Sequence, residues 1–452
     1  MEYRRNLTPL GRTTVFKSLV FSQLNHLFLV LPNPNESVIN ELRKLMFSFI
    51  WNSPIDKIKR EVAVQNYDQG GLKILDLNAF INALKSTWIR RYYMGTGKWK
   101  LLLSVSVNFD LLTNCGPNYI KNSISKLNDF WKHVFNAWNR IIEINSTKKV
   151  DSCPLGLPIW YNSQILIDSN PIFYRSWYEK GIFRIGDFIK ESSVYYTFEE
   201  FTEKYNIETN FLTYHGILNC LKKYINSFPN MPTKIHYPTF PKNIAIFYQS
   251  KKGTKDIYSI LSENNIVPTG VIRWNMALNL HEDEWKFIFI NPFLITKYTT
   301  LQWFQFRINH RILGTNLLLH KIDNNTDYKC TFCKREPETI EHLLWECELV
   351  KKLLNDFDIF TTANNIPFTY NKITFLFGLY SENKHFRVDS YIILCIKYYI
   401  YKTRCQNKTL SLCALKQYLK SAYETRKHLS ITKGTYTIFS LQWQIWKQIF
   451  EV

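Results

Sequence analysis

The segment at residues 330–347, "CTFCKREPETIEHLLWEC", holds three cysteines and one histidine at the spacing C-x2-C-x8-H-x4-C. Zinc takes four tetrahedral ligands from thiolates and imidazoles, and C-x2-C lets one tight turn present two sulfurs to a single ion. An x4 gap lies within the range that zinc ligand pairs use. We predict that this segment binds one structural zinc ion through Cys330, Cys333, His342 and Cys347. The alternative is a chance cluster of buried cysteines.

The geometry of the second ligand pair is less simple. Pro337 interrupts the chain, and Thr339 can cap a short helix that carries His342. On an ideal helix Cys347 lies about 140° around from His342. The two side chains can share an ion only if they flank it obliquely or if the helix distorts near Cys347. Three thiolates leave about one net negative charge on bound zinc, which indicates a structural site with no open coordination position.

The composition indicates a polyanionic partner. The chain has 452 residues, with 57 Lys and Arg against 37 Asp and Glu, for a net charge of +20. Such an excess favours nucleic acid or, less often, an anionic membrane surface, and the 16% aromatic content supplies rings that can stack on bases. The alternative is a basic protein whose charge serves solubility alone.

The compartment is predicted from the ends and the cysteines. No apolar run follows the basic residues of the N-terminus, and no window reaches about eighteen uninterrupted apolar residues. We expect an intracellular protein of the nucleus or cytoplasm, not secreted, with no membrane partner and no small-molecule substrate. In a reducing interior clustered Cys and His favour metal over disulfides. The remaining six cysteines are expected to be core thiols: Cys115, Cys153, Cys220, Cys395, Cys405 and Cys413.

Periodicity predicts a mainly α-helical, multi-unit chain with minor β content. One helix is expected over 13–31, ended by "PNPN", a second from about Ser37 that ends at "FIWN" (49–52), and a third capped by Asp76. The short run "VAV" at 62–64 is expected to be extended. Two apolar stripes are expected to face the core: Val15, Leu19, Leu24, Leu27 and Leu31 on the first helix, and Val38, Leu42, Leu45 and Phe49 on the second.

Basic residues beside aromatics are the candidate nucleic-acid contacts. A single helix over 296–322 would place Arg307 and Arg311 on one face beside His310. Lys334 and Arg335 lie on the loop between zinc ligands, where a fixed turn could aim them at phosphates. A solvated surface is the alternative for each. The full predicted set is Arg12, Lys17, Arg90, Arg91, Arg307, His310, Arg311, Lys334, Arg335, Lys397, Lys402 and Arg404.

Motifs for catalysis are missing from the sequence. A polymerase palm needs carboxylates that converge on magnesium, usually including adjacent aspartates, and no Asp-Asp dipeptide occurs. There is no G-x-S-x-G, H-E-x-x-H or complete P-loop. We predict no catalytic residues. The competing hypothesis of a cryptic enzyme predicts magnesium-dependent incorporation or cleavage.

Two parts of the chain resemble one known family. The segments "RRNLTPLGRTTVFKSLVFSQLNHLFLVLPNP" (4–34), "FSFIWN" (47–52) and "GGLKILDLNAFINALKSTWIRR" (70–91) resemble the thumb-like helical segment after the palm of LINE-type non-LTR retrotransposon reverse transcriptases. "LQWFQFRINHRILGTNLLLHKI" (301–322), with the cysteine segment after it, is similar to the C-terminal zinc-binding region of that family. The two matches occur in the order of the family.

The resemblance implies a non-catalytic C-terminal remnant of an RNA-directed DNA polymerase, because the endonuclease and the palm would precede residue 1. A 5′-truncated copy or a gene model opened at an internal Met would explain that start. The expected role is to grip template RNA or target DNA in target-primed reverse transcription, within a retroelement ribonucleoprotein. The implied segments are 1–98 (thumb-like, after an absent palm), 99–295 (mixed, mostly helical connector), 296–350 (basic helix and zinc module) and 351–452 (basic helical region).

A zinc-stabilised protein-interaction scaffold without a nucleic-acid role is the alternative function. Salt separates the two functions, because phosphate contacts weaken steeply as salt rises and an apolar interface does not.

Overall fold

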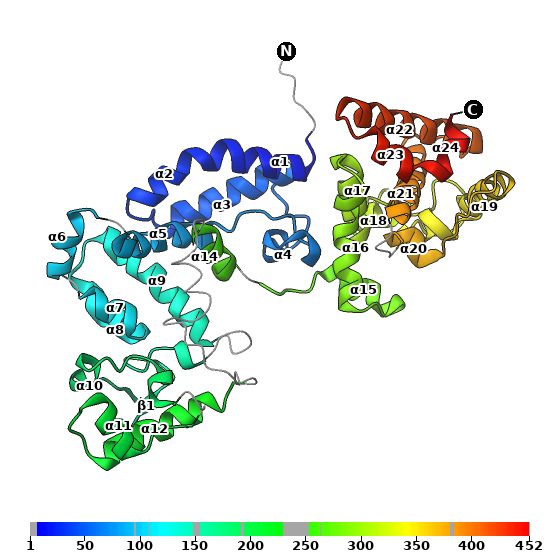
Figure 1. Ribbon diagram of the computed structural model, residues 1–452. Helices are drawn as coiled ribbons and strands as arrows, with labels where there is room; N and C mark the ends of the chain where they lie inside the picture. Colours follow the sequence, from blue (N-terminus) through cyan, green and yellow to red (C-terminus); the bar gives the residue numbers. More distant parts are fainter. Residues whose placement is uncertain are drawn as a thin grey trace. The chain divides into compact units, whose positions relative to one another are not determined.

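The chain is mostly helical, as the sequence predicts (Figure 1). The structure is a computed structural model that describes residues 7–94, 96–106, 108–147, 154–190, 194–228, 253–262, 264–379 and 384–451. Within these residues the one sheet is a two-stranded antiparallel pair, β1 (Leu166–Ile167) and β2 (Asn170–Pro171). No helix in the described ranges is both long and apolar enough to cross a membrane.

The chain divides into two compact units that follow packing rather than chain order. Unit 1 combines Met1–Phe16, Leu45–Ile74 and Asn264–Val452, and unit 2 combines Lys17–Lys44 and Leu75–Glu263. The four segments implied by the resemblance remain predictions.

Unit 1 contains the C-terminal helices, drawn in green to red in Figure 1. Its elements are α1 (Pro9–Val15), the C-terminal part of α3 (Glu36–Trp51), α4 (Arg60–Val64), the 3-10 turn η2 (Tyr67–Gln69), α15 (Thr269–Leu278), α16 (Glu282–Ile295), α17 (Thr299–Asn309), α18 (Asn316–Ile322), the π-helical turn η6 (His342–Glu346), α19 (Glu348–Ala363), α20 (Lys372–Phe377), α21 (Lys384–Cys405), α22 (Leu412–Thr432), α23 (Tyr436–Gln442) and α24 (Gln444–Phe450).

Unit 2 contains the remaining elements. They are the π-helical turn η1 (Phe16–Phe21), α2 (Ser22–Val30), the N-terminal part of α3, α5 (Leu77–Met94), α6 (Trp99–Ser106), α7 (Phe109–Asn114), α8 (Pro117–Ser123), the 3-10 turn η3 (Ile124–Lys126), α9 (Asp129–Thr147), the 3-10 turn η4 (Pro154–Gly156), β1, β2, α10 (Arg175–Glu179), the 3-10 turn η5 (Ile185–Phe188), α11 (Phe198–Tyr205), α12 (Phe211–Ile225) and α14 (Gly253–Ser262).

The local signals for helix ends are confirmed. The "PNPN" segment ends the first helical stretch, because α2 stops at Val30. Oδ1 of Asp76 accepts a hydrogen bond from the amide of Ala79 at 3.0 Å, which caps α5. The expected extended segment at 62–64 is wrong, because those residues belong to the short helix α4.

The predicted core face of the first helical stretch is wrong. Leu19 is 61% exposed and Leu27 and Leu31 are also exposed, whereas Phe21 and Phe28 are buried. The five predicted residues do not share one face of a regular helix, because Leu27 and Leu31 lie about 120° and 160° around from Val15.

The predicted face of α3 is wrong for a different reason. Leu45 and Phe49 are exposed, while Ile39, Met46 and Ile50 on the neighbouring stripe are buried. Apolar residues fill both stripes of α3, so the period of the pattern cannot decide which stripe enters the core.

Cysteines outside the zinc segment are not all core thiols. Cys115 and Cys395 are buried and Cys220 is half-buried. Cys405 and Cys413 are exposed because they lie near the end of α21 and the start of α22, and Cys153 lies outside the described residues.

The zinc segment belongs to the main core of unit 1. Cys330, Leu343, Leu344 and Cys347 have no exposed surface and join a cluster that includes Ile396 of α21. Loss of the zinc segment would therefore open a large apolar core.

Candidate metal centre

Four side chains of unit 1 converge on one point: Cys330, Cys333, His342 and Cys347. Their ligand atoms all lie within 4.8 Å of one another. Sγ of Cys330 is 3.9 Å from Sγ of Cys347, and Sγ of Cys333 is 3.4 Å from Nε2 of His342. Around tetrahedral zinc, bonds of about 2.3 Å to sulfur and 2.0 Å to nitrogen separate neighbouring ligands by about 3.5–3.8 Å. The four residues therefore fit one zinc ion.

A tight hairpin presents the first two sulfurs. The amide of Cys330 donates to the carbonyl of Glu336 at 2.8 Å, and the amide of Lys334 donates to the carbonyl of Cys330 at 2.9 Å. Lys334 has a φ of 58°, a left-handed conformation that closes the turn. Cys330 and Cys333 are thereby fixed on one side of the loop.

A π-helical turn brings the second pair together. The amide of Cys347 donates to the carbonyl of His342 at 2.9 Å, a bond between residues five apart. The wider turn places residues five apart on the same side, which an ideal α-helix does not. Thr339 caps the segment as predicted, because its Oγ1 accepts from the amide of His342 at 2.9 Å. Of the two geometries that the sequence allowed, the structure has the distorted helix.

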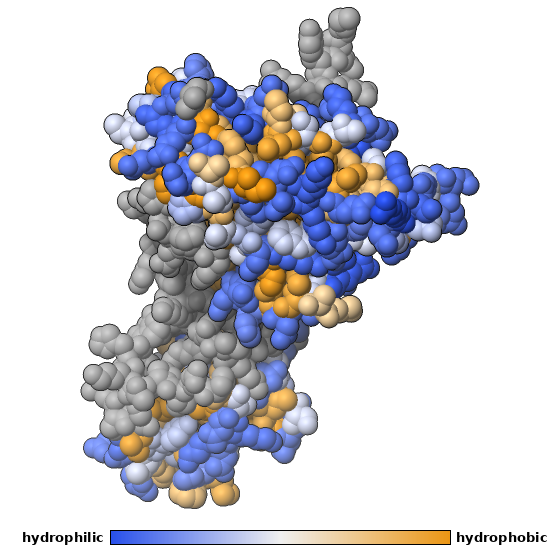
Figure 2. All heavy atoms as spheres, turned by 90° about the vertical axis from the view of Figure 1, so that its right-hand side faces the viewer, coloured by the Kyte–Doolittle hydropathy of each residue, from blue (hydrophilic) through white to orange (hydrophobic). Residues whose placement is uncertain are grey.

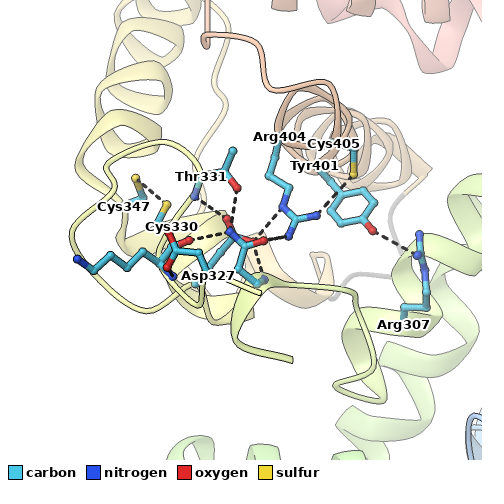
Figure 3. A network of polar contacts seen from close by, with 11 residues as sticks. Arg307, Asp327, Cys330, Thr331, Cys347, Tyr401, Arg404 and Cys405 are labelled. Carbon is cyan, nitrogen blue, oxygen red and sulfur yellow. Dashed lines mark hydrogen bonds and ion pairs between the residues drawn. The ribbon is translucent and has the colours of Figure 1, made fainter. Parts of the chain in front are cut away.

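A buried carboxylate locks the hairpin onto helix α21. Glu338 has no exposed surface and accepts hydrogen bonds from the amides of Asn316 at 2.9 Å and Thr331 at 2.8 Å. Nη2 of Arg404 lies 2.8 Å from Oε1 of Glu338. Figure 3 shows Arg404 reaching from α21 toward the loop that carries Cys330 and Thr331. Glu338 is not among the residues predicted from the sequence.

Arg404 was predicted to contact nucleic acid, and its position contradicts this. The Arg404 side chain is 10% exposed and forms an ion pair with Glu338. It also donates a hydrogen bond to Oδ1 of Asn316. The physical reason is that a buried carboxylate needs a cation beside it.

The predicted single helix over 296–322 is wrong. Helix α17 ends at Asn309, and α18 begins only at Asn316. Arg311 lies beyond the helix end with a φ of 56°. Arg307 and Arg311 therefore do not share a helical face.

Three of the predicted nucleic-acid-binding residues lie near the break between α17 and α18. The side chain of each contacts another group of the protein. Arg311 pairs with Glu341 at 2.7 Å and stacks 4.1 Å from the centroid of the Trp274 ring. The guanidinium of Arg307 lies 5.2 Å from the centroid of the Tyr401 ring. His310 is buried, and its Nε2 lies 2.9 Å from the carbonyl oxygen of Gly70.

The other predicted contacts differ in exposure. Lys17, Arg91, Lys334, Arg335 and Lys402 are exposed, and Arg12 and Arg90 are half-buried. Arg335 forms an exposed ion pair with Glu348 at 3.2 Å, Arg91 lies 4.8 Å from the centroid of the Trp88 ring, and Nη1 of Arg12 donates to the carbonyl of Phe49 at 3.1 Å. Their binding to nucleic acid stays a prediction.

Lys397 is buried in the core of unit 1, so a phosphate contact is excluded in this conformation. It is 1% exposed, and its Nζ donates to Oε1 of Gln305 at 2.5 Å and to the carbonyl of Leu376 at 2.7 Å. Burial lowers its pKa well below the ordinary value, because an ammonium group loses its hydration there. Apolar residues on both sides of Lys397 in "SYIILCIKYYIYK" were the signal for burial.

Lys397→Met is expected to leave nucleic-acid affinity unchanged and to flatten the pH dependence of stability. The unfolded chain keeps the lysine proton up to a pH of about 10.4, while the folded chain releases it at lower pH. Stability therefore rises with pH between the folded and the unfolded pKa, and methionine removes this rise. Thermal melts from about pH 7 to 9 measure it, with Lys402→Met on the exposed side of α21 as the control. Equal pH profiles for wild type and Lys397→Met would contradict the assignment.

A groove beside the zinc hairpin brings basic residues together from three parts of unit 1. The cavity has a volume of about 610 Å³ and is lined by Lys334 of the hairpin, Lys352 of α19 and Lys408 of the loop before α22. These lysines are exposed and have no ion-pair partner within the described residues. Phe332 and Asp356 also line the groove. Neither Lys352 nor Lys408 is among the residues predicted from the sequence.

Comparison with known families locates the similarity in this part of the chain. Residues 254–353 match the family described as zinc-binding in reverse transcriptase. This stretch is a reverse-transcriptase-related zinc-binding region. It contains all four ligands and begins well before the hairpin, so it includes helices α15 to α18. A search of curated proteins gave no match.

Proposed function

We propose that the chain is a non-catalytic C-terminal part of a LINE-type retrotransposon reverse transcriptase, in which the zinc-binding region grips RNA or DNA. The observation that carries the proposal is the groove beside the zinc hairpin. Three unpaired lysines and one carboxylate give it an excess of positive charge. Lysines neutralise backbone phosphates, and this contact dominates affinity for nucleic acid.

The ring of Phe332 gives the groove a second property. Phe332 is half-buried on the hairpin between Cys330 and Cys333, and it lines the same cavity as the lysines. An aromatic ring beside phosphate-binding lysines supports stacking of an unpaired base. We therefore favour a single strand, or a strand end, over the middle of a duplex.

Zinc would act structurally in this function. Bound by Cys330, Cys333, His342 and Cys347, it would hold the hairpin against η6. The turn that closes the first ligand pair fixes the backbone of Lys334. The backbone in turn sets the direction of the Lys334 side chain. No catalytic step is assigned to the zinc-binding region.

The thumb-like role of the N-terminal segment is part of the same proposal. In unit 2 several apolar residues of α2 and its neighbours are exposed: Leu19, Val20, Leu27, Val30, Leu31 and Val38. A helical segment that packs on another domain in a larger protein would carry such a surface.

The same exposed residues favour a protein-interaction scaffold as the second candidate. On the face drawn in Figure 2, hydrophobic residues occur as separate patches among hydrophilic ones. An apolar interface would be insensitive to salt, whereas phosphate binding weakens as salt rises.

The triple variant Lys334→Gln/Lys352→Gln/Lys408→Gln is expected to weaken binding of single-stranded RNA and DNA. Glutamine keeps the length of the side chain and removes the charge. For three lost phosphate contacts, the slope of log affinity against log salt should become less steep by about two. Fluorescence anisotropy between about 50 and 200 mM salt measures it.

A matched control removes three other exposed lysines of unit 1 that do not line the groove, in Lys297→Gln/Lys321→Gln/Lys433→Gln. The control should change the slope much less. Equal slopes for the two triple variants would contradict the groove assignment, and salt-independent binding by the wild type would favour the scaffold.

A further inference from the structure

A second basic cavity of unit 1 shares no lining residue with the groove. It has a volume of about 380 Å³ and forms where the loop before α4 meets the start of α15 and the end of α17. Lys57, Lys59, Arg273, Thr269, Gly270 and His310 are among the residues that line it. None of the three cations belongs to the set predicted from the sequence.

The charges of this cavity are unbalanced. Lys57, Lys59 and Arg273 are exposed, and none of their side chains has a hydrogen bond or ion pair with any described residue. The one acidic residue in the lining is Asp56. It forms an ion pair with Arg60, with 2.7 Å between Oδ2 of Asp56 and Nε of Arg60. Three positive charges thus surround the cavity without a protein anion to neutralise them.

The start of α15 adds backbone donors to the same cavity. The N-cap residue is Pro268, which supplies no side-chain cap. The amides of Thr269 and Gly270 have no hydrogen-bond partner in the described ranges, whereas those of Val271 and Ile272 donate to Pro268. Unpaired amides at the positive end of a helix favour an anion.

The side of the cavity formed by Gly270 and His310 is closely packed and uncharged. A Cβ atom at Gly270 would lie 2.6 Å from Cα of His310 and 2.7 Å from the carbonyl oxygen of Asn309, so α15 packs directly on the end of α17. Burial lowers the pKa of His310 to about 4, and the ring is therefore neutral at pH 7. With Nε2 donating to Gly70, the histidine holds the η2 turn in place rather than contributing charge.

We propose that this cavity binds a backbone phosphate of the nucleic acid, through Lys57, Lys59, Arg273 and the first amides of α15. The proposal rests on the proposed function and adds a second contact point to the groove. Two separate contacts would let unit 1 follow a strand rather than hold a single nucleotide.

The test compares Lys57→Gln/Lys59→Gln/Arg273→Gln with the control triple Lys297→Gln/Lys321→Gln/Lys433→Gln. For one lost phosphate contact, the slope of log affinity against log salt should become less steep by about one. Zinc content and melting temperature should equal those of the wild type, because the three side chains have no protein partner. A slope equal to that of the control, with the groove variant still weakened, would overturn the cavity while leaving the proposed function intact.

Thr269→Glu separates binding from folding. An acid in the first turn of α15 favours the helix through the dipole, so the melting temperature should stay equal or rise. The added negative charge should repel phosphate and weaken binding by about threefold or more. Unchanged affinity would overturn the proposal.

A last experiment distinguishes failure of the proposed function from failure of the cavity proposal alone. If the wild type binds no nucleic acid, the proposed function fails and the cavity proposal fails with it. A thermal shift with inorganic phosphate, lost in the cavity triple, would then identify a site for free phosphate instead of a strand.

Discussion

Cys330→Ser/Cys333→Ser is expected to lose the zinc ion and to unfold much of unit 1. Serine offers no thiolate, and two remaining ligands cannot hold a structural zinc. Cys330 and Cys347 lie in the main core with Leu343 and Leu344, so the loss exposes apolar surface beyond the hairpin. We expect a cost of about 5 kcal/mol or more, which lowers the melting temperature by about 10–20 °C.

The control for this experiment is Cys405→Ser/Cys413→Ser, which changes two exposed cysteines of the same unit. It should keep its zinc and melt close to the wild type. Calorimetry measures the melting temperature, and zinc analysis measures the metal content. If the Cys330→Ser/Cys333→Ser variant retained zinc and melted like the control, the ligand assignment would be wrong.

Arg404→Leu is expected to destabilise unit 1 by about 3–5 kcal/mol, because it leaves the carboxylate of Glu338 buried without a cation. Glu338 also accepts from the amides of Asn316 and Thr331, so its displacement would loosen the zinc hairpin. We therefore expect weaker zinc binding as well as a lower melting temperature. Denaturant unfolding and competition with a zinc chelator measure the two effects.

Arg335→Leu is the matched control, because Arg335 pairs with Glu348 on the surface. An exposed pair contributes about 0–1 kcal/mol, so this variant should be nearly neutral. Adding Glu338→Gln to Arg404→Leu should recover part of the loss, since no buried charge remains. Equal costs for Arg404→Leu and Arg335→Leu would contradict the role of the buried pair.

The convergence of the three cysteines and the histidine could be predicted because the information for it is local. C-x2-C needs only one turn, and Thr339 caps its helix within three residues of His342. A distortion of the helix near Cys347 could be predicted as one of two alternatives, because on a regular helix His342 and Cys347 can share an ion only by flanking it obliquely. Spacing alone could not choose between them.

The buried faces of the helices and the partners in ion pairs were less predictable, because they depend on residues far apart in the chain. Apolar residues of α3 fill two neighbouring stripes, and which of them is buried depends on the segments that pack against the helix. Arg404 lies 66 positions from Glu338, so its ion pair could not be read from either neighbourhood. The cavity at Lys57 and Arg273 joins segments that are still further apart.

Zinc stoichiometry of the purified chain tests the central claim most directly. Native mass spectrometry before and after chelation, on the same folded sample, counts the ions per chain. We expect one zinc per chain, and we expect its removal to abolish the cooperative melting of unit 1. A folded chain that contains no zinc and takes up none would contradict the zinc site at Cys330, Cys333, His342 and Cys347.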